Sequence, residues 1–282
     1  MAQVPAGVLK KAVSRALQED VGIGDITTAA IVPEGQKGRA TVITRGAIVL
    51  AGAAAFEEVF QQVGGVEVEW QYADGDPVAA GEQIATLKGS LAAILTGERT
   101  ALNFLMRLSG IATLVAQYVK AVEGTRCRIV DTRKTTPGLR ALEKAAVEAG
   151  GARNHRFGLF DGVLIKDNHI AAAGSVALAV KRARAAAPHT LKIEVEIAKL
   201  HQLDEAIQAG ADVVMLDNMT ADDARRAVEI AAGRVLLEAS GGMTLEAVRA
   251  YAAAGVDLIS VGRLTHSAPA ADLSLTVKKG GA

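Results

Sequence analysis

The residues with the clearest potential for chemistry are Asp-Thr-Arg-Lys-Thr-Thr-Pro-Gly, at positions 131–138. They follow a short apolar run, residues 127–130, which predicts a buried strand. Ligands of α/β proteins bind at the carboxyl ends of strands, so this segment indicates a site for a multiply charged anion. Surface pairing of Arg133 and Lys134 with acidic residues is the alternative explanation.

The elements that must position this segment form a regular pattern. From about residue 125, apolar strand-like runs alternate with amphipathic helical stretches, and several of the helices end at a glycine. Such alternation predicts a parallel sheet in a closed or nearly closed α/β barrel. The expected strands are residues 128–131, 162–166, 192–197, 212–217, 234–238 and 257–262, and a seventh could lie within 151–154. The expected helices are residues 139–149, 175–187, 200–209, 221–232 and 245–253.

The preceding part of the chain has a different pattern, which predicts a small α+β domain. Its expected helices are residues 6–20, 53–63 and 91–122, the last with a break near Ser109-Gly110. Its expected strands are residues 40–44, 47–50, 66–72 and 83–87.

Polar residues stand at the carboxyl end of almost every expected barrel strand, where they would converge on one mouth. They are Asp131, Lys166, Glu196, Asp217, Glu238 with Ser240, and Gly262. In the strand at 192–197, Lys192, Glu194 and Glu196 share one face because side chains alternate along a strand. If the opposite, apolar face packs on helices, these three charges point into the barrel. An interior ion network of Lys192 and Glu194 is the competing explanation for them, and Glu196, nearest the carboxyl end, is assigned to the site. Glu194 could reach the substrate or only support Lys192.

Two glycine-containing turns resemble phosphate cradles. Ala239-Ser240-Gly241-Gly242 and Val261-Gly262-Arg263 each follow an expected strand. Backbone N–H groups at such turns, with a following helix N-terminus, bind anions. Either turn alone is equally consistent with a tight connection. Asn154-His155-Arg156 adds a cation and a titratable imidazole. With Arg133, Lys134 and Lys166 this makes at least four potential positive charges, which favour a substrate that carries several carboxylates or phosphates.

Composition excludes several classes of protein. The formal net charge is zero, from 31 basic and 31 acidic residues, so neither nucleic acid nor membrane is an expected partner. The single Cys127 excludes an intramolecular disulfide and a cysteine-based zinc site. The first residues lack the layout of a signal peptide, and no run of about 18 apolar residues is present, so a soluble cytoplasmic protein is expected.

Taken together, these motifs resemble those of the quinolinate phosphoribosyltransferases. The resemblance covers nearly the whole chain, in the family's order. Besides residues 131–138, it includes Gly-Asp-Ile-Thr-Thr (24–28), Glu-Arg-Thr-Ala-Leu-Asn (98–103), Leu-Ser-Gly-Ile-Ala-Thr (108–113), Asn-His-Arg (154–156), Leu-Ile-Lys-Asp-Asn-His (164–169), Glu-Val-Glu (194–196), Met-Leu-Asp-Asn (215–218), Glu-Ala-Ser-Gly-Gly (238–242) and Ser-Val-Gly-Arg-Leu-Thr-His-Ser (260–267).

The resemblance implies an N-terminal α/β sandwich domain, residues 1–112, and an open TIM-like α/β barrel of about seven strands, residues 113–270. Residues 271–282 would return to the N-terminal domain. The implied reaction joins quinolinate to 5-phosphoribosyl-1-pyrophosphate with Mg²⁺, and gives nicotinate mononucleotide, pyrophosphate and carbon dioxide in de novo NAD synthesis.

It also implies roles for individual residues. Arg133, His155, Arg156 and Lys166 match positions that hold the quinolinate carboxylates, with Thr132 beside them, and Lys134 matches a group near the pyrophosphate. Glu196 and Asp217 match acids at the ribose and Mg²⁺. Ser240, Gly241, Gly242 and Gly262 match the 5′-phosphate cradle, with His266 as a further candidate. Arg99 matches an arginine donated across a homodimer interface, and Arg263 departs from an expected small residue.

Three alternatives to this activity remain. A paralogue associated with molybdenum-transport operons would share most of the motifs. A nicotinate-specific phosphoribosyltransferase would not need to bind a second carboxylate, so the cation cluster argues against it. A non-catalytic protein that binds a phosphorylated metabolite would not explain acids and cations gathered at one mouth.

Overall fold

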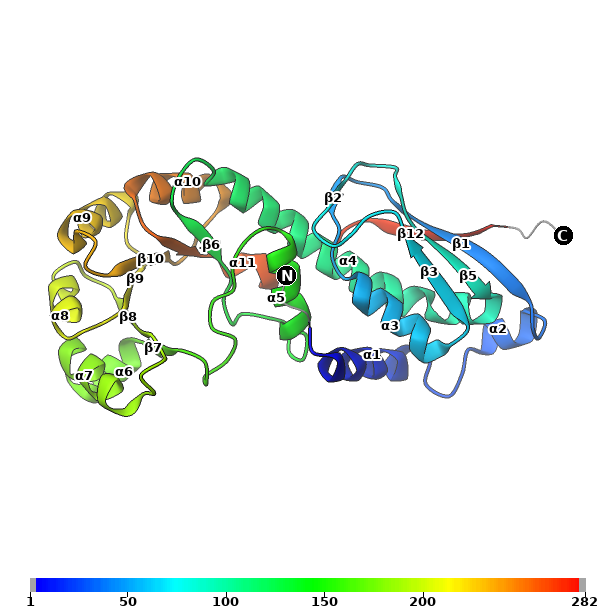
Figure 1. Cartoon of the computed structure of the whole chain (residues 1–282), viewed down its shortest axis with the longest axis horizontal. Helices are drawn as coiled ribbons and strands as arrows, with labels where there is room; N and C mark the ends of the chain where they lie inside the picture. Colours follow the sequence, from blue (N-terminus) through cyan, green and yellow to red (C-terminus); the bar gives the residue numbers. More distant parts are fainter. Residues whose placement is uncertain (1–3, 279–282) are drawn as a thin grey trace. The chain divides into compact units, whose positions relative to one another are not determined.

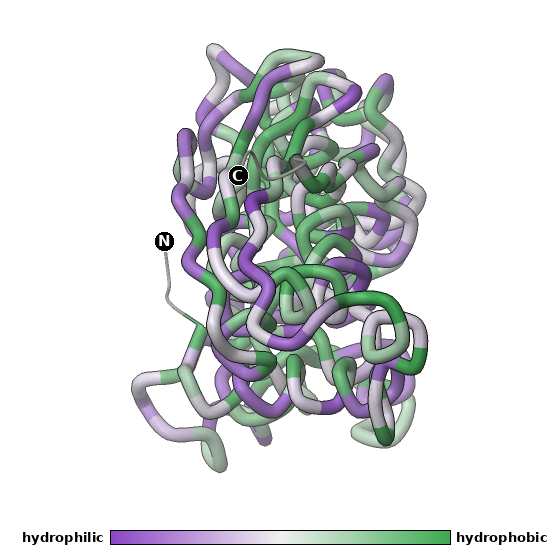
Figure 2. Tube along the Cα trace, turned by 90° about the vertical axis from the view of Figure 1, so that its right-hand side faces the viewer, coloured by the Kyte–Doolittle hydropathy of each residue, from purple (hydrophilic) through white to green (hydrophobic). Residues whose placement is uncertain are grey.

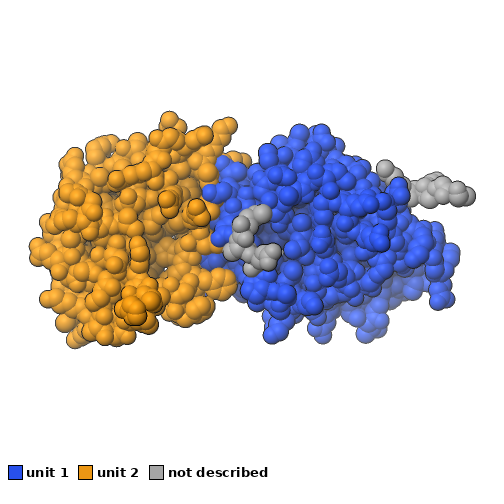
Figure 3. Space-filling model, viewed as in Figure 1, with its two compact units in different colours: residues 1–116, 135–151, 267–282 blue, residues 117–134, 152–266 orange. Residues whose placement is uncertain are grey.

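The computed structural model describes residues 4–278, which form two compact units (Figure 3). The first unit contains the chain up to residue 116, residues 135–151 and the chain from 267 onward. The second contains residues 117–134 and 152–266. The sequence assigned 135–151 to the barrel. That segment packs in the first unit because Gly150 lies directly against Val115 and Ala112 of a long helix of that unit.

An antiparallel sheet organises the first unit. Its order is β12(Leu273–Lys278), β1(Lys37–Thr44), β5(Gln83–Ser90) and β3(Val66–Trp70). The last described strand therefore pairs with the first, with Thr41 opposite Thr276. A separate two-stranded antiparallel sheet pairs β2(Ile48–Val49) with β4(Pro77–Val78), with α3 and β3 between them in the sequence. This sheet confirms the predicted N-terminal half of the fold.

Five helices complete the first unit (Figure 1). They are α1(Ala6–Asp20), α2(Ile26–Ile31), α3(Ala53–Val63), α4(Leu91–Ala121) and α5(Arg140–Ala149). Helix α3 contacts strand β3, and Gly97 of α4 lets the ring of Phe60 approach closely.

The expected break in α4 near Ser109-Gly110 was wrong, because the helix is continuous. A Cβ atom at Gly110 would lie 2.0 Å from the carbonyl oxygen of Pro269. The glycine therefore allows a close approach of two backbone segments rather than a bend. By length and composition α4 could cross a membrane, but 56% of its apolar window is buried inside the protein, as in an ordinary core helix.

A parallel sheet organises the second unit, as predicted. Its strand order is β6(Arg128–Val130), β11(Leu258–Ser260), β10(Leu236–Ser240), β9(Val213–Asp217), β8(Ile193–Ile197) and β7(Val163–Ile165). Residue Arg153 forms a single parallel bridge to Val130, beside the β6 edge. The seventh strand that we expected near 151–154 is therefore one bridging residue.

Helices cover the outer side of these strands (Figure 1). They are α6(Asp167–Ala173), α7(Val176–Ala186), α8(Gln202–Gln208), α9(Ala221–Ala231), α10(Leu245–Ala254) and the short α11(Arg263–His266). The hydroxyl groups of Thr220 and Thr244 cap α9 and α10, and α10 ends at Gly255 in the left-handed conformation. Hydrophobic and hydrophilic stretches alternate along the trace (Figure 2), as helices with one buried face require.

Candidate active site

The segment after β6 is held in place by hydrogen bonds within the second unit. Asp131 is fully buried, and its Oδ1 accepts the backbone N–H of His155 at 2.8 Å. The Thr132 hydroxyl accepts the backbone N–H of Lys134 at 3.1 Å. The Thr265 hydroxyl donates to the carbonyl oxygen of Lys134 at 2.8 Å. The Lys134 side chain is exposed while its backbone is fixed at both ends.

The ring of His155 has a defined tautomer. Its Nδ1 accepts the backbone N–H of Arg156 at 2.7 Å, so this nitrogen carries no proton. Its Nε2 lies 2.9 Å from Oε2 of Glu194 and 3.8 Å from Oε2 of Glu238. A carboxylate oxygen accepts, so Nε2 is the donor in this contact with Glu194.

Glu194 and Glu238 form an acidic pair behind this ring, and both are buried. Burial first, and then the charge of Glu194, raises the pKa of Glu238 to about 8, although His155 opposes the shift. The alternative of an interior ion network was right for Glu194 but wrong for Lys192 as its partner. Lys192 precedes β8 and is exposed, and Glu194 pairs with His155 instead.

Two guanidinium groups lie close together beside the acidic pair. Burial, and then the charge of Arg133, lowers the pKa of Arg156. An Nη atom of Arg156 donates to the carbonyl oxygen of Gly162 at 3.1 Å, which directs its side chain. Two neighbouring cations with a fixed direction suit a ligand that has more than one carboxylate.

Lys166, Glu196 and Asp217 form the centre of the mouth. Lys166 Nζ lies 3.4 Å from Oε2 of Glu196. Burial raises the pKa of Glu196, Lys166 opposes this, and the charge of Asp217 raises it further. Asp217 Oδ2 also accepts the side-chain N–H of Asn218 at 2.9 Å. Two carboxylates that repel each other are hard oxygen donors, so this pair fits Mg²⁺.

The turn after β10 depends on the absence of a side chain at Gly241. Its φ is +96°, and a Cβ atom would lie 2.1 Å from Oδ1 of Asn218. Asn218 itself has a positive φ of 53°, and its N–H donates to the Ser240 carbonyl oxygen. The residue after β9 and the turn after β10 therefore pack directly against each other.

A second glycine shapes the turn after β11. A Cβ atom at Gly262 would lie 3.0 Å from Cδ of Lys134 and 3.3 Å from the His266 ring. These two side chains therefore meet over Gly262. The Ser260 hydroxyl donates to that of Ser240 at 2.9 Å and links the two turns. Arg263, the departure from the family pattern, is exposed at the start of α11.

His155 and Arg156 lie in the loop before β7, His266 ends α11, and the other predicted site residues of the second unit lie at or just after the carboxyl ends of its strands. The structure thus places most of the predicted site residues on the second unit. These are Thr132, Arg133, Lys134, His155, Arg156, Lys166, Glu196, Asp217, Ser240, Gly241, Gly242, Gly262 and His266. Arg99 is the exception, because it is exposed on α4 of the first unit.

Two features of the site escaped the sequence interpretation. The pairing of His155 with Glu194 joins residues from separate elements, and no local pattern could indicate it. The role of Asn218 had a local signal, since an asparagine directly after a strand often adopts the positive φ that is seen here.

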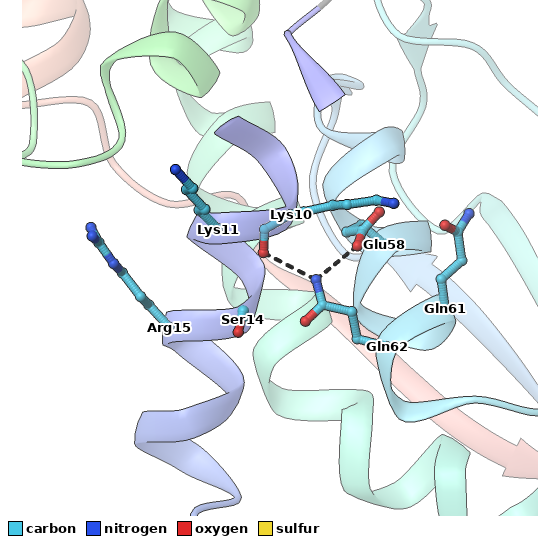
Figure 4. Close-up of a pocket in the computed structure, with 7 residues that line it drawn as sticks. All are labelled: Lys10, Lys11, Ser14, Arg15, Glu58, Gln61 and Gln62. Atoms are coloured by element: carbon cyan, nitrogen blue, oxygen red, sulfur yellow. Dashed lines mark hydrogen bonds between the residues drawn. The ribbon is translucent and has the colours of Figure 1, made fainter. Parts of the chain in front are cut away.

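A separate groove of about 790 Å³ lies on the first unit, between α1 and α3 (Figure 4). Lys10, Lys11 and Arg15 line one side of it. On the other side, Gln62 Nε2 donates to Glu58 Oε1 at 2.7 Å and to the Lys10 carbonyl oxygen at 3.1 Å. None of its lining residues belongs to the predicted site, and its chemistry is that of two solvated helix surfaces.

Comparisons with known proteins agree with this architecture. Residues 25–109 match the N-terminal domain of quinolinate phosphoribosyl transferase, and residues 111–276 match its C-terminal domain. A probable nicotinate-nucleotide pyrophosphorylase (carboxylating) from Bacillus subtilis is 48% identical over 270 residues, which is 95% of this chain and 93% of that protein. The human nicotinate-nucleotide pyrophosphorylase (carboxylating) is 38% identical over 96% of this chain and 92% of its own length.

A solved structure of the nicotinate-nucleotide pyrophosphorylase from Francisella tularensis superposes with a TM-score of 0.94 at 43% identity. That similarity covers 98% of each chain. Both family domains are matched in order, and the relatives are similar over almost their whole length. The chain therefore belongs to the quinolinate phosphoribosyltransferase family.

Proposed function

We propose that this protein transfers the phosphoribosyl group of 5-phosphoribosyl-1-pyrophosphate to quinolinate, with loss of one carboxylate as carbon dioxide. The product is nicotinate mononucleotide, a precursor of NAD. The observation that carries the proposal is the group of cations Arg133, Arg156 and Lys166 on the second unit, in which the Arg156 guanidinium is directed by its 3.1 Å hydrogen bond to the Gly162 carbonyl oxygen. A dicarboxylate can satisfy two such cations, whereas a monocarboxylate can satisfy only one guanidinium group bidentately.

The other side of the mouth suits the phosphorylated substrate. The turns at Ser240-Gly241-Gly242 and Gly262 offer backbone N–H groups for the 5′-phosphate. Lys134 and His266 meet over Gly262, where Lys134 can neutralise the pyrophosphate. Glu196 and Asp217 would hold Mg²⁺, largely through the substrate and water. When bound there, the ion supplies positive charge that favours departure of pyrophosphate.

The reaction breaks the bond from ribose C1 to the pyrophosphate oxygen, and the electron pair leaves with pyrophosphate. Positive charge grows on the ribosyl carbon, and the carboxylates of Glu196 and Asp217 stabilise it electrostatically. The quinolinate nitrogen then forms the new bond to C1. As the adjacent carboxylate leaves as carbon dioxide, the electron pair of the breaking C–C bond stays on the ring carbon, where the positive pyridinium nitrogen stabilises it. A proton from solvent then forms the new C–H bond at that carbon. No protein nucleophile is needed.

The proposed active form is a homodimer in which Arg99 enters the partner's site. The family resemblance supports this proposal, and the exposure of Arg99 on α4 is compatible with it. Mixing Arg99→Ala subunits with subunits that carry Asp217→Asn tests it, because mixed dimers would regain one intact site. Failure of the mixture to recover activity would contradict the donation.

The direct test of the function measures carbon dioxide and nicotinate mononucleotide with quinolinate as substrate and nicotinate in parallel. We expect Mg²⁺-dependent turnover with quinolinate alone. Turnover with nicotinate would favour the nicotinate-specific enzyme. Binding without turnover of either acid would contradict the proposal and favour the transport-associated paralogue or a binding protein.

A further inference from the structure

One fully buried carboxylate is not among the predicted site residues but binds the segment that carries Lys134. Glu143, in the first turn of α5, has no exposed surface. Its Oε1 accepts the Thr136 hydroxyl at 2.7 Å, and its Oε2 accepts the Thr136 backbone N–H at 3.0 Å. Thr136 follows Lys134 by two residues, so this carboxylate fixes the chain shortly after a predicted site residue.

The charge partner of Glu143 is Arg107 of α4. Arg107 donates from Nε at 3.1 Å and from Nη2 at 2.8 Å, and both bonds end on Oε1 of Glu143. An arginine that pairs with a carboxylate as a fork gives one N–H to each oxygen. Here Oε2 receives the backbone N–H of Thr136 instead. The carboxylate is therefore oriented by the segment as well as by the arginine.

The same guanidinium group also fixes a second segment. Its Nη1 donates to the carbonyl oxygen of Ala268 at 3.0 Å. Ala268 follows His266 by two residues, which is the same spacing as on the first segment. The ion pair therefore binds both chain segments whose side chains, Lys134 and His266, meet over Gly262.

We propose that Glu143 and Arg107 form a positioning unit, which holds Lys134 and His266 together for the phosphorylated substrate. This inference rests on the proposed function. Neither member of the pair contacts the substrate, and each acts through the segment that it binds. Lys134 remains the group that neutralises the pyrophosphate.

A purely structural ion pair is the alternative explanation. A buried carboxylate is costly unless its oxygens are bonded, and a buried ion pair contributes little net stability compared with apolar residues. Within the described chain, four hydrogen bonds reach the Glu143 side chain, two from Arg107 and two from Thr136. Because Thr136 is exposed, its bonds add little to the packed core. Their main consequence is the direction of the chain after Lys134.

The backbone of Lys134 also has two anchors of its own. Its N–H donates to the Thr132 hydroxyl, and its carbonyl oxygen accepts the Thr265 hydroxyl. Thr132 belongs to the same segment and would move with it, and Thr265 does not fix the direction that the chain takes beyond the carbonyl. Since only one residue separates Thr136 from Lys134, a shift at Thr136 is carried to Lys134 through about 7 Å of chain.

The test is kcat/KM for 5-phosphoribosyl-1-pyrophosphate in variants of the exposed Thr136. Thr136→Val removes the hydroxyl bond but keeps the size of the side chain, and we expect about a tenfold fall, through a higher KM. Thr136→Ser retains the hydroxyl and should restore the unmodified value. Glu143→Gln should lower kcat/KM on the order of 100-fold, because an amide offers one accepting oxygen in place of two.

A double-mutant cycle separates positioning from stability. In the Lys134→Ala background, Thr136→Val should change kcat/KM for the ribosyl donor by less than about twofold, because the group that Thr136 positions is absent. A full tenfold fall in that background would overturn the proposal. An unchanged kcat/KM in both Thr136→Val and Glu143→Gln would overturn it as well.

The matched control is Thr125→Val. Thr125 is also exposed, and its hydroxyl also donates a 2.7 Å bond, to the carbonyl oxygen of Val122. Urea denaturation should show a similar small loss of stability in Thr125→Val and Thr136→Val, but only Thr136→Val should lose kcat/KM. An equal kinetic loss in both variants would mean that loss of stability is the cause, and would overturn the positioning role.

Calorimetric titration with 5-phosphoribosyl-1-pyrophosphate and Mg²⁺, without quinolinate, gives a readout that does not depend on turnover. We expect Kd to be about tenfold higher in Thr136→Val and unchanged in Thr136→Ser. Equal Kd values in the unmodified protein and Thr136→Val would contradict the proposal. The proposed function fails by a different result, which is absence of quinolinate turnover in the unmodified protein.

Discussion

The two sides of the mouth are built by different means. The dicarboxylate side, formed by Arg133, His155, Arg156 and Lys166, depends on charged side chains that are held by hydrogen bonds to other side chains and to the backbone. The proposed phosphate side, formed by Ser240, Gly241, Gly242, Gly262 and His266, depends on the close approach of neighbouring side chains that glycine allows at Gly241 and Gly262.

This difference predicts which kinetic constant a substitution on each side should change. On the dicarboxylate side, charged side chains depend on the charge and orientation of neighbouring groups. A substitution there should therefore impair the use of quinolinate, and the size of its effect should depend on pH. A glycine turn acts through geometry, so a substitution should act on the ribosyl donor and should not change with pH. In the proposed reaction, Glu196 and Asp217 serve the step that both substrates share.

The largest effect should come from this shared centre. Asp217→Asn keeps the shape of the side chain but removes a charge that stabilises the ribosyl cation. We expect kcat to fall on the order of 1000-fold, with smaller changes in both KM values. Steady-state kinetics with each substrate varied in turn would measure this, and Asp222→Asn on the surface of α9 is the control. A rise of similar size in the KM for one substrate, with kcat unchanged, would instead assign Asp217 to the side that binds that substrate.

The next effect should be confined to the dicarboxylate side. Arg133→Ala removes one guanidinium group, and we expect a loss of about 3 kcal/mol, which corresponds to about 100-fold in kcat/KM for quinolinate. KM for 5-phosphoribosyl-1-pyrophosphate should change little. Arg225→Ala, an exposed arginine on α9, is the control. A similar fall in kcat/KM for both substrates would mean that Arg133 does not act on quinolinate alone.

A smaller effect should appear on the phosphate side. Gly241→Ala places a Cβ atom against the Asn218 side chain, so the turn must shift. We expect KM for the ribosyl donor to rise about tenfold, from a loss of roughly 1.4 kcal/mol, at all pH values. Gly233→Ala is matched to it, because Gly233 also has a positive φ but open space around its Cβ position.

Both variants should lose about 1 kcal/mol of stability from backbone strain, measured by urea denaturation. Only Gly241→Ala should lose affinity for the donor. If the two variants behave alike in the kinetic assay, the close contact with Asn218 does not shape the phosphate side.

The sequence predicted the two sides to different degrees. The glycine turns, the acids at the strand ends and the strand–helix alternation are local patterns, and the structure contains them at nearly the expected positions. The interior of the dicarboxylate side depends on contacts between β8, β10 and residues 154–156. The alternation rule placed Glu194 inside the barrel, but no rule of spacing identifies His155 rather than Lys192 as its partner.

The continuous helix α4 is a second case in which a contact between distant parts of the sequence could not be predicted from a local pattern. Gly110 suggested a break, and local propensity alone would support that interpretation. The glycine at position 110 is instead required by the close approach of the backbone at Pro269, which is more than 150 residues away in the sequence. Contacts of this range override local preference, and they become visible only when the fold is known.

The last effect should appear in stability rather than in turnover, and it concerns Glu238. The pKa of Glu238 is raised in the folded state to about 8, from an ordinary value of 4.5. Below pH 4.5 both the folded and unfolded states hold the proton. As the pH rises toward 8 the unfolded state releases it first, so the unmodified protein loses stability, by at most about 1.4 kcal/mol per pH unit.

Glu238→Gln cannot titrate, so its stability relative to the unmodified protein should increase from pH 5 to pH 8 in urea denaturation. Glu229→Gln, on the exposed surface of α9, should show no such trend. A parallel pH dependence of Glu238→Gln and the unmodified protein would mean that Glu238 is ionised in the folded state.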